Sequence, residues 1–178
     1  MISLKYVLFV LIAVIFTWVL HEFSHWCVGE LLGNDMVMTL NSSYPKSRTY
    51  IEPWNAMIVS AAGPLITLVQ AVVFYMFLKR HTSACLFPFL LTCLYMRVLA
   101  GAMNVINLND EGRISKALGL GTFTLPILMT VVLFYLTYDI AKARGYRTKF
   151  IVVSVLLITL FTSIVILGDQ ALRIVVLS

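Results

Sequence analysis

Five long apolar segments constrain the fold of this chain more than any other feature of its sequence. Each is long enough to form a helix that crosses the roughly 30 Å hydrocarbon core of a bilayer, which takes about 20 residues. The chain is 61% hydrophobic and 12% charged, whereas soluble domains average about 25% charged residues. We therefore expect an all-α, multi-pass integral membrane protein with spans at residues 4–28, 54–78, 84–106, 122–141 and 149–167.

The sequence favours a single structural unit. We find no linker, low-complexity stretch or soluble segment in residues 1–178, so we expect one transmembrane domain. The first segment has Lys5 before its apolar run, as a signal peptide would, but it lacks a small-residue cleavage site. Cleavage after it would also separate the polar motif of this segment from the rest of the chain. We therefore interpret the first segment as a retained span.

The first span contains an H-E-x-x-H motif made by His21, Glu22 and His25. On a helix, residues four apart project from one face, about one turn apart. Two imidazoles at this spacing can share a zinc ion, and the glutamate is close enough to act on a water at the metal. Such groups are costly inside a membrane unless they act together. The alternative is a pair of interfacial histidines that hydrogen-bond to neighbouring helices. The motif lies about 24 Å along a helix from Lys5, inside the hydrocarbon but near the far surface.

A site with two histidines needs a third ligand, and topology narrows the search. The first and third spans run in the same direction, so their C-terminal ends reach the same membrane face. The segment after the third span, residues 104–113, is rich in asparagine and acid. We expect Asp110 to be the third metal ligand, with Glu111 as the alternative; an ordinary loop in which Asp110 caps a helix is the other interpretation. Asn104 or Asn107 could stabilise an oxyanion or hold the substrate backbone, or could cap a frayed helix end.

The loop between the first two spans contains a predicted β-hairpin. Residues 36–41 and 48–52 have the pattern of two short strands, with a turn at residues 41–46. A hairpin beside the site would offer an open edge to an extended peptide. A surface hairpin without a partner is the alternative. The hairpin interpretation therefore favours a peptide substrate.

These elements resemble the site-2 protease family of intramembrane zinc metalloproteases. The resemblance begins with the H-E-x-x-H motif and continues to Gly33, since that family commonly ends its motif helix with glycine. Residues 61–64 (Ala-Ala-Gly-Pro) are similar to the family's Gly-Pro element beside the active-site helix. Residues 104–112 are similar to the asparagine-and-proline stretch that leads to the family's Asp-Gly ligand motif. The resemblance covers about residues 1–116, and the last two spans carry no family marker.

The chain departs from the family pattern in its second and third motifs. Thr67 stands three residues after the Gly-Pro proline, where the family usually has asparagine. Asn107 and Asn109 stand where proline is expected, and Glu111 interrupts the Asp-Gly pair. The resemblance therefore implies a compact, divergent member.

The motifs and the resemblance together predict a zinc endopeptidase that acts inside the membrane. Zinc held by His21, His25 and Asp110 would activate a water, and Glu22 would take its proton as general base. The expected substrate is a transmembrane or membrane-anchored protein, which a regulatory membrane partner could help to select. The alternative is a non-proteolytic membrane scaffold or metal-binding protein that keeps the protease fold. The intact Glu22 favours the enzyme, whereas the altered third motif favours the alternative.

The charged residues mostly flank the spans. The net charge of +5 predicts no nucleic-acid partner, because such a partner would need a basic face on a soluble surface. Seven Lys and Arg residues lie on the face of the N-terminus and five on the other, which mildly favours a cytoplasmic N-terminus. The usual family arrangement opposes this count, so the orientation stays open. Arg97 falls inside the third span, where we expect it to pair with an acid or to snorkel rather than to act in catalysis.

Overall fold

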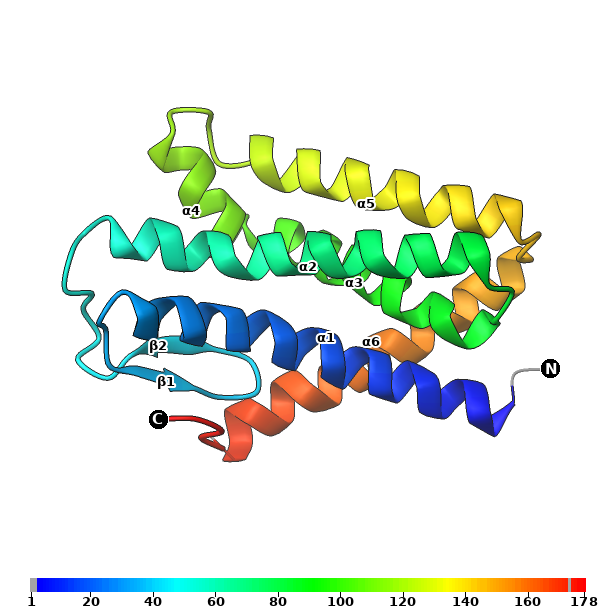
Figure 1. Cartoon of the computed structure of the whole chain (residues 1–178), viewed down its shortest axis with the longest axis horizontal. Coiled ribbons are helices and arrows are strands. Elements are labelled where there is room, and N and C mark those ends of the chain that lie inside the picture. Colours follow the sequence, from blue (N-terminus) through cyan, green and yellow to red (C-terminus); the bar gives the residue numbers. More distant parts are fainter. Residues whose placement is uncertain (1–2, 173) are drawn as a thin grey trace.

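The computed structural model describes residues 3–172 and 174–178. These residues form six α-helices, a short 3₁₀ helix and a two-stranded sheet (Figure 1), in the order α1 (Leu4–Leu31), β1 (Met36–Met38), β2 (Ser43–Pro45), α2 (Asn55–Arg80), η1 (Ala84–Leu86), α3 (Phe87–Met103), α4 (Asp110–Ala117), α5 (Thr124–Ala143) and α6 (Thr148–Leu172). Within this part of the chain, α1, α2, η1 with α3, α5 and α6 are long and apolar enough to cross a membrane. The prediction of five such helices, with a hairpin after the first, is confirmed, and their ends shift by only a few residues.

Both ends of α1 follow from its sequence. The Ser3 hydroxyl accepts a hydrogen bond from Tyr6 N (3.2 Å) and caps the first turn. At the other end, Gly33 adopts φ = +81° and its N–H donates to the Glu30 carbonyl (2.9 Å). A left-handed residue just past the last turn is the usual way in which glycine ends a helix. The helix therefore carries the H-E-x-x-H motif six to ten residues before its C-terminal end.

The long helices run alternately up and down, so two sets of connections gather at opposite ends (Figure 1). The hairpin, the start of α2, α4 and the C-terminal residues lie at one end, which we call the site end. The start of α1, the α2–η1 connection and the α5–α6 turn lie at the other. As predicted, α1 and α3 finish at the same end. The short helix α4 follows α3 there and packs against α2 and α5.

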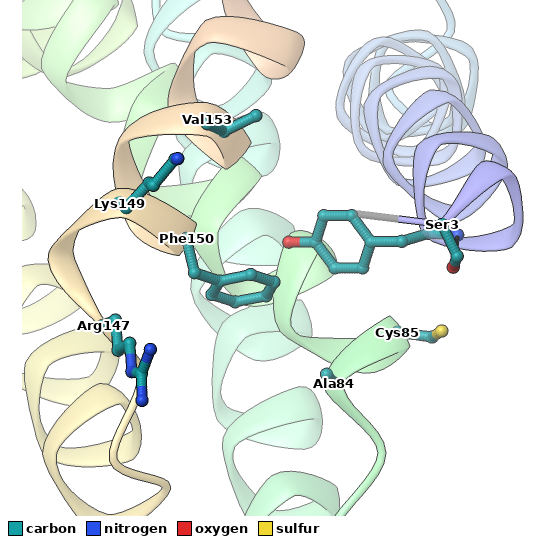
Figure 2. Close-up of a pocket in the computed structure, with 8 residues that line it drawn as sticks. Ser3, Ala84, Cys85, Arg147, Lys149, Phe150 and Val153 are labelled. Carbon is teal, nitrogen blue, oxygen red and sulfur yellow. Dashed lines mark hydrogen bonds between the residues drawn. The ribbon is translucent and has the colours of Figure 1, made fainter. Parts of the chain in front are cut away.

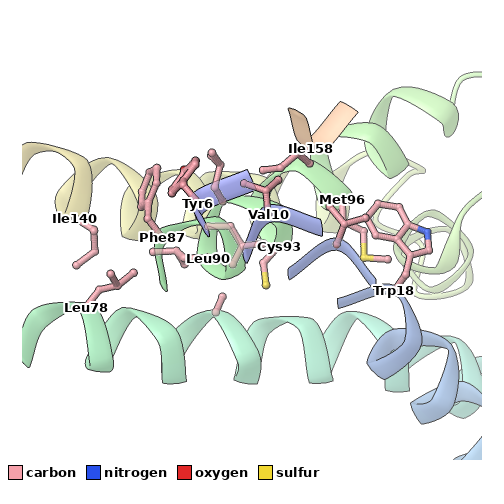
Figure 3. Packing of buried hydrophobic residues seen from close by; sticks show 14 residues of the cluster. Tyr6, Val10, Trp18, Leu78, Phe87, Leu90, Cys93, Met96, Ile140 and Ile158 are labelled. Carbon is pink, nitrogen blue, oxygen red and sulfur yellow. The ribbon is translucent and has the colours of Figure 1, made fainter. Parts of the chain in front are cut away.

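Apolar packing holds α1, α2, α3, α5 and α6 together (Figure 3). Val10, Phe87, Leu90 and Ile158 are fully buried in this core. Lipid tails are as apolar as these side chains, so in a membrane van der Waals packing rather than transfer from water holds such helices together. The outward faces of the helices are also apolar, as a lipid environment requires. The core therefore fixes α1 against α2 and α3, and the polar groups of the site end are placed on this rigid bundle.

The second strand of the hairpin lies earlier in the chain than predicted. β1 pairs antiparallel with β2, in which Met38 is opposite Ser43 and Met36 is opposite Pro45. Residues 48–52 form bends and irregular backbone instead, and Arg48 has φ = +62°, which leaves the extended region. Pro45 suggested a turn, but proline is tolerated where its missing N–H faces away from the neighbouring strand. The prediction of a hairpin is confirmed, and the prediction that its second strand spans residues 48–52 is wrong.

The outer edge of β1 is already paired. Met38 N donates to the Leu177 carbonyl (2.9 Å), and Val176 N donates to the Met38 carbonyl (2.8 Å). Met36 N donates to the carboxylate of Glu30 on α1 (2.7 Å). This edge is therefore closed to a further strand, which leaves the edge of β2.

The turn of the hairpin is tied to α6. The Thr39 hydroxyl donates to Asp169 Oδ2 (2.9 Å), and Leu40 N donates to Asp169 Oδ1 (3.0 Å). Trp18 Nε1 on α1 donates to Asn41 Oδ1 (2.9 Å) at the same turn. The hairpin is thus fixed to α1 and α6 and is held in place beside the H-E-x-x-H motif.

Candidate metal centre

Two histidines of α1 and an aspartate of α4 converge at the site end. His21 Nε2 and His25 Nε2 lie 3.2 Å apart. Asp110 Oδ2 lies 3.4 Å from His21 Nε2 and 3.2 Å from His25 Nε2. Both histidines are buried, and the Asp110 side chain is 17% exposed. The structure thus brings together the three residues that the sequence nominated as metal ligands, in a group that could hold a metal ion.

The outer ring nitrogens of both histidines have acceptors. His25 Nδ1 lies 2.6 Å from the Val59 carbonyl, which can only accept a hydrogen bond. His21 Nδ1 lies 3.2 Å from Thr67 Oγ1, whose own proton is donated to the Gly63 carbonyl (2.9 Å). Val59 thus fixes the proton of His25 on Nδ1, and Thr67 favours the same tautomer for His21, which lets both Nε2 atoms present lone pairs. Such partners fix the orientation and tautomer of metal-binding histidines.

Asp110 is oriented from its other side. Arg113 Nη2 donates to Asp110 Oδ1 (2.6 Å), which leaves Oδ2 to face the histidines. Asn109 caps α4 by accepting from Gly112 N (2.7 Å), so Asp110 is the first residue of the helix and not its cap. Three potential ligand atoms thus meet within 3.4 Å of one another, and either a shared proton or a metal cation among them would relieve their mutual repulsion.

Close packing of α2 against α1 depends on Gly63. A Cβ atom at this position would overlap His21 Cε1 and His25 Nε2. Helix interfaces in membranes are enriched in small residues because these let the backbones approach closely. The Ala-Ala-Gly-Pro sequence therefore leaves the space in which the two imidazoles lie.

Glu111, the alternative third ligand, turns to a different partner. Its Oε1 accepts from Arg97 Nη1 of α3 at 2.8 Å, and both side chains are buried. Arg97 Nη2 also lies 3.5 Å from His21 Nδ1. Pairing with an acid is one of the two outcomes expected for Arg97. Its position beside the histidines was missed, because the distance along the helix from Asp110 does not show how α3 packs against α1.

Asn104 and Asn107 lie in the connection between α3 and α4. Asn104 Nδ2 donates to the Thr122 carbonyl (2.7 Å), and Asn104 Oδ1 accepts from Asn109 N (3.0 Å). Asn107 is exposed. The side chain of Asn104 thus holds the loop that leads into α4, and a Cβ at Gly112 would overlap it. Its observed contacts are structural.

A cavity of about 310 Å³ opens beside the three converging residues. Glu22 and His25 form its α1 wall, and Asp110 and Arg113 its α4 wall. The remaining walls come from residues 41–44 of the hairpin, Tyr50 and the start of α2. Glu22 is buried in this wall. The hydroxyl of the hairpin residue Ser43 donates to the Glu22 carbonyl (2.9 Å). Burial raises the pKa of Tyr50, so its hydroxyl stays protonated and can donate a hydrogen bond.

The open edge of β2 borders this cavity. Bonded and non-bonded pairs alternate along an antiparallel ladder. Thr39 N donates to the Ser42 carbonyl and Lys46 N to the Asp35 carbonyl, so these are the bonded pairs. Ser43 lies between them and directs its N–H and C=O away from β1. An extended peptide that paired with Ser43 would run past Glu22.

Comparison with protein-family models, with curated proteins and with solved structures finds no significant match. The function must therefore be inferred from the geometry of the site. Sequence reasoning missed the roles of Thr67, Val59, Arg113 and Tyr50. Of these, only the contact of Arg113 could have been predicted, since Arg113 follows Asp110 by three residues and residues three apart on a helix are neighbours.

Proposed function

We propose that this chain is an intramembrane zinc metalloprotease, a zinc metalloendopeptidase that hydrolyses membrane-anchored protein substrates. One observation carries the proposal: His21, His25 and Asp110 present three lone-pair atoms to one point, next to Glu22 and an open cavity. A structural metal site is closed by four protein ligands, whereas a catalytic one keeps a position open. Three ligands beside a cavity match the catalytic arrangement.

The donor set fits zinc. Ligand atoms about 2.0–2.2 Å from zinc at tetrahedral angles lie about 3.3 Å from one another. The three distances observed among the ligand atoms are 3.2, 3.2 and 3.4 Å. Two imidazoles and one carboxylate are also a common catalytic zinc set. Zinc bound there would supply the Lewis acidity that activates water and polarises a peptide carbonyl.

The residues of the chain supply the remaining chemistry. Glu22 lines the cavity next to His25 and serves as general base, taking a proton from the attacking water and passing it to the leaving amine. Ser43 on the open edge of β2 pairs with the backbone of the substrate, which must be extended for its carbonyl to be reached. We assign to Tyr50, which also lines the cavity, a hydrogen bond from its hydroxyl to a substrate oxygen.

The test measures bound zinc and cleavage of a transmembrane reporter on the same purified samples. Glu22→Gln should keep the zinc of the wild type and lose cleavage by about 10²–10⁴-fold, which is the usual contribution of a general base. His25→Ala and Asp110→Asn should lose both. Wild type that holds zinc but cuts none of a panel of membrane-anchored reporters would instead support the non-proteolytic scaffold. A Glu22→Gln variant that still cleaves would contradict the proposal.

A further inference from the structure

The end of the bundle opposite the metal centre is strongly cationic. Seven of the 13 Lys and Arg residues lie there, against one of the 8 acids, Asp139. The seven are Lys5, Lys79, Arg80, Lys142, Arg144, Arg147 and Lys149. Basic residues in this position attract the anionic head groups of membrane lipids.

Two of these cations are engaged within the protein. Lys79 pairs with Asp139 at 2.5 Å and so links α2 to α5. The guanidinium of Arg144 donates to the carbonyls of Leu78 and His81 and caps the end of α2. These two charges therefore serve the fold.

Arg147 and Lys149 line a cavity instead (Figure 2). The cavity measures about 470 Å³, which lies within the range of small-molecule sites. It lies between the starts of α1 and α6 and the 3₁₀ helix η1, and both cationic side chains are exposed. The structure thus places two cationic residues on the lining of one concave surface.

The interior of this cavity is mostly apolar and rigid. The rings of Tyr6 and Phe150 pack with centroids 5.0 Å apart, and Val153 continues the wall one turn along α6. The Tyr6 hydroxyl is already hydrogen-bonded to Ser154 Oγ (2.6 Å). The walls therefore present hydrocarbon, while the two cationic residues present positive charge. A ligand that matches both must have an anionic head and an apolar tail.

The cavity also lies at the level where such molecules are found. It is bounded by Ser3, directly before α1, and by Arg147, directly before α6. Both helices are long and apolar enough to span a bilayer, so their first residues lie near the head groups. We propose that the cavity binds an anionic phospholipid, with the phosphate against Arg147 and Lys149 and one acyl chain against Phe150 and Val153.

The test compares retention of phosphatidylglycerol and phosphatidylcholine by the purified whole chain, measured by native mass spectrometry. The wild type should retain one phosphatidylglycerol in preference to phosphatidylcholine. The double variant Arg147→Gln/Lys149→Gln should bind it about 30-fold more weakly, since each cation near a membrane surface contributes about 1 kcal/mol. Arg80→Gln/Lys142→Gln removes the same charge from the same face outside the cavity. This control should change affinity less than about threefold, because exposed charges beyond about 8–10 Å are screened.

A second variant tests the acyl chain independently of the charges. Val153→Trp fills the apolar wall and should abolish retention of the lipid while the melting temperature and zinc content stay at the wild-type values. Equal retention of phosphatidylcholine, or unchanged binding by Arg147→Gln/Lys149→Gln or by Val153→Trp, would overturn the proposal. So would displacement of the lipid by millimolar inorganic phosphate, which would mark a simple anion site.

Discussion

At the residue scale, the convergence of His21, His25 and Asp110 could be predicted from the sequence, whereas the groups that orient them could not. His21 and His25 follow from a four-residue spacing on one helix, which is a local property. Asp110 required only the direction of two spans. Thr67 and Val59, which accept from the outer nitrogens of the histidines, lie on another helix and depend on its rotation. The rotation of α2 depends on how it packs against α1 at Gly63, and this packing cannot be read from a single sequence.

Thr67 provides a test of this outer layer. Thr67→Val removes the acceptor of His21 Nδ1 at nearly constant volume, so His21 loses its fixed tautomer. We expect zinc affinity to fall about 10–100-fold, as is typical for such partners. The measurement is competition with a chelator of known zinc affinity.

Thr137→Val is the matched control. Thr137 is also buried and donates to the carbonyl four residues earlier (2.8 Å), but it lies on α5 away from the metal centre. Zinc affinity of this variant should equal that of the wild type. If Thr67→Val bound zinc as tightly as Thr137→Val, Thr67 would not be the residue that orients His21.

At the element scale, the long helices could be predicted, whereas the bounds of the short elements could not. Span-length apolar runs are unmistakable, whereas β2 has three residues and α4 has eight. The sequence left open a loop in which Asp110 caps a helix. Asn109 caps that helix instead, and Arg97 links it to α3 through Glu111. That pair is 14 residues apart in sequence, and its formation depends on how the chain reverses. The Glu111 that interrupts the family's Asp-Gly pattern thus acquires a structural role.

The Arg97–Glu111 pair should position Asp110 through α4. Arg97→Gln alone should destabilise the protein by about 3–5 kcal/mol, because it leaves a buried charge unpaired. The double variant Arg97→Met/Glu111→Leu replaces both charges by apolar groups and should recover most of that stability. Its zinc affinity should nevertheless stay about tenfold below that of the wild type, since Asp110 is no longer held. Thermal unfolding and chelator competition measure the two quantities separately.

A charge pair outside the site serves as the control for this result. Lys79→Met/Asp139→Leu removes the partly exposed pair between α2 and α5 and should leave zinc affinity unchanged. If Arg97→Met/Glu111→Leu also bound zinc like the wild type, α4 would position Asp110 without the buried pair.

At the scale of the whole molecule, the two ends of one apolar bundle carry different chemistry. The site end combines buried histidines, acids and an open strand edge, while the opposite end carries most of the positive charge. The number of long helices and their alternation could be predicted because each depends on composition alone. The closeness of α1 and α4, between which residues 32–109 intervene, depends on the packing of both helices against α2.

Zinc shared by α1 and α4 would join these two parts of the molecule, and X-ray absorption at the zinc edge of the purified protein tests this directly. We predict a first shell of nitrogen and oxygen at about 2.0–2.2 Å, with the imidazole signature of two histidines. The signature should change in His25→Ala, and the shell should lose an oxygen ligand in Asp110→Asn. A shell that contains sulfur at about 2.3 Å, or a spectrum that is identical in wild type and both variants, would contradict the zinc site described here.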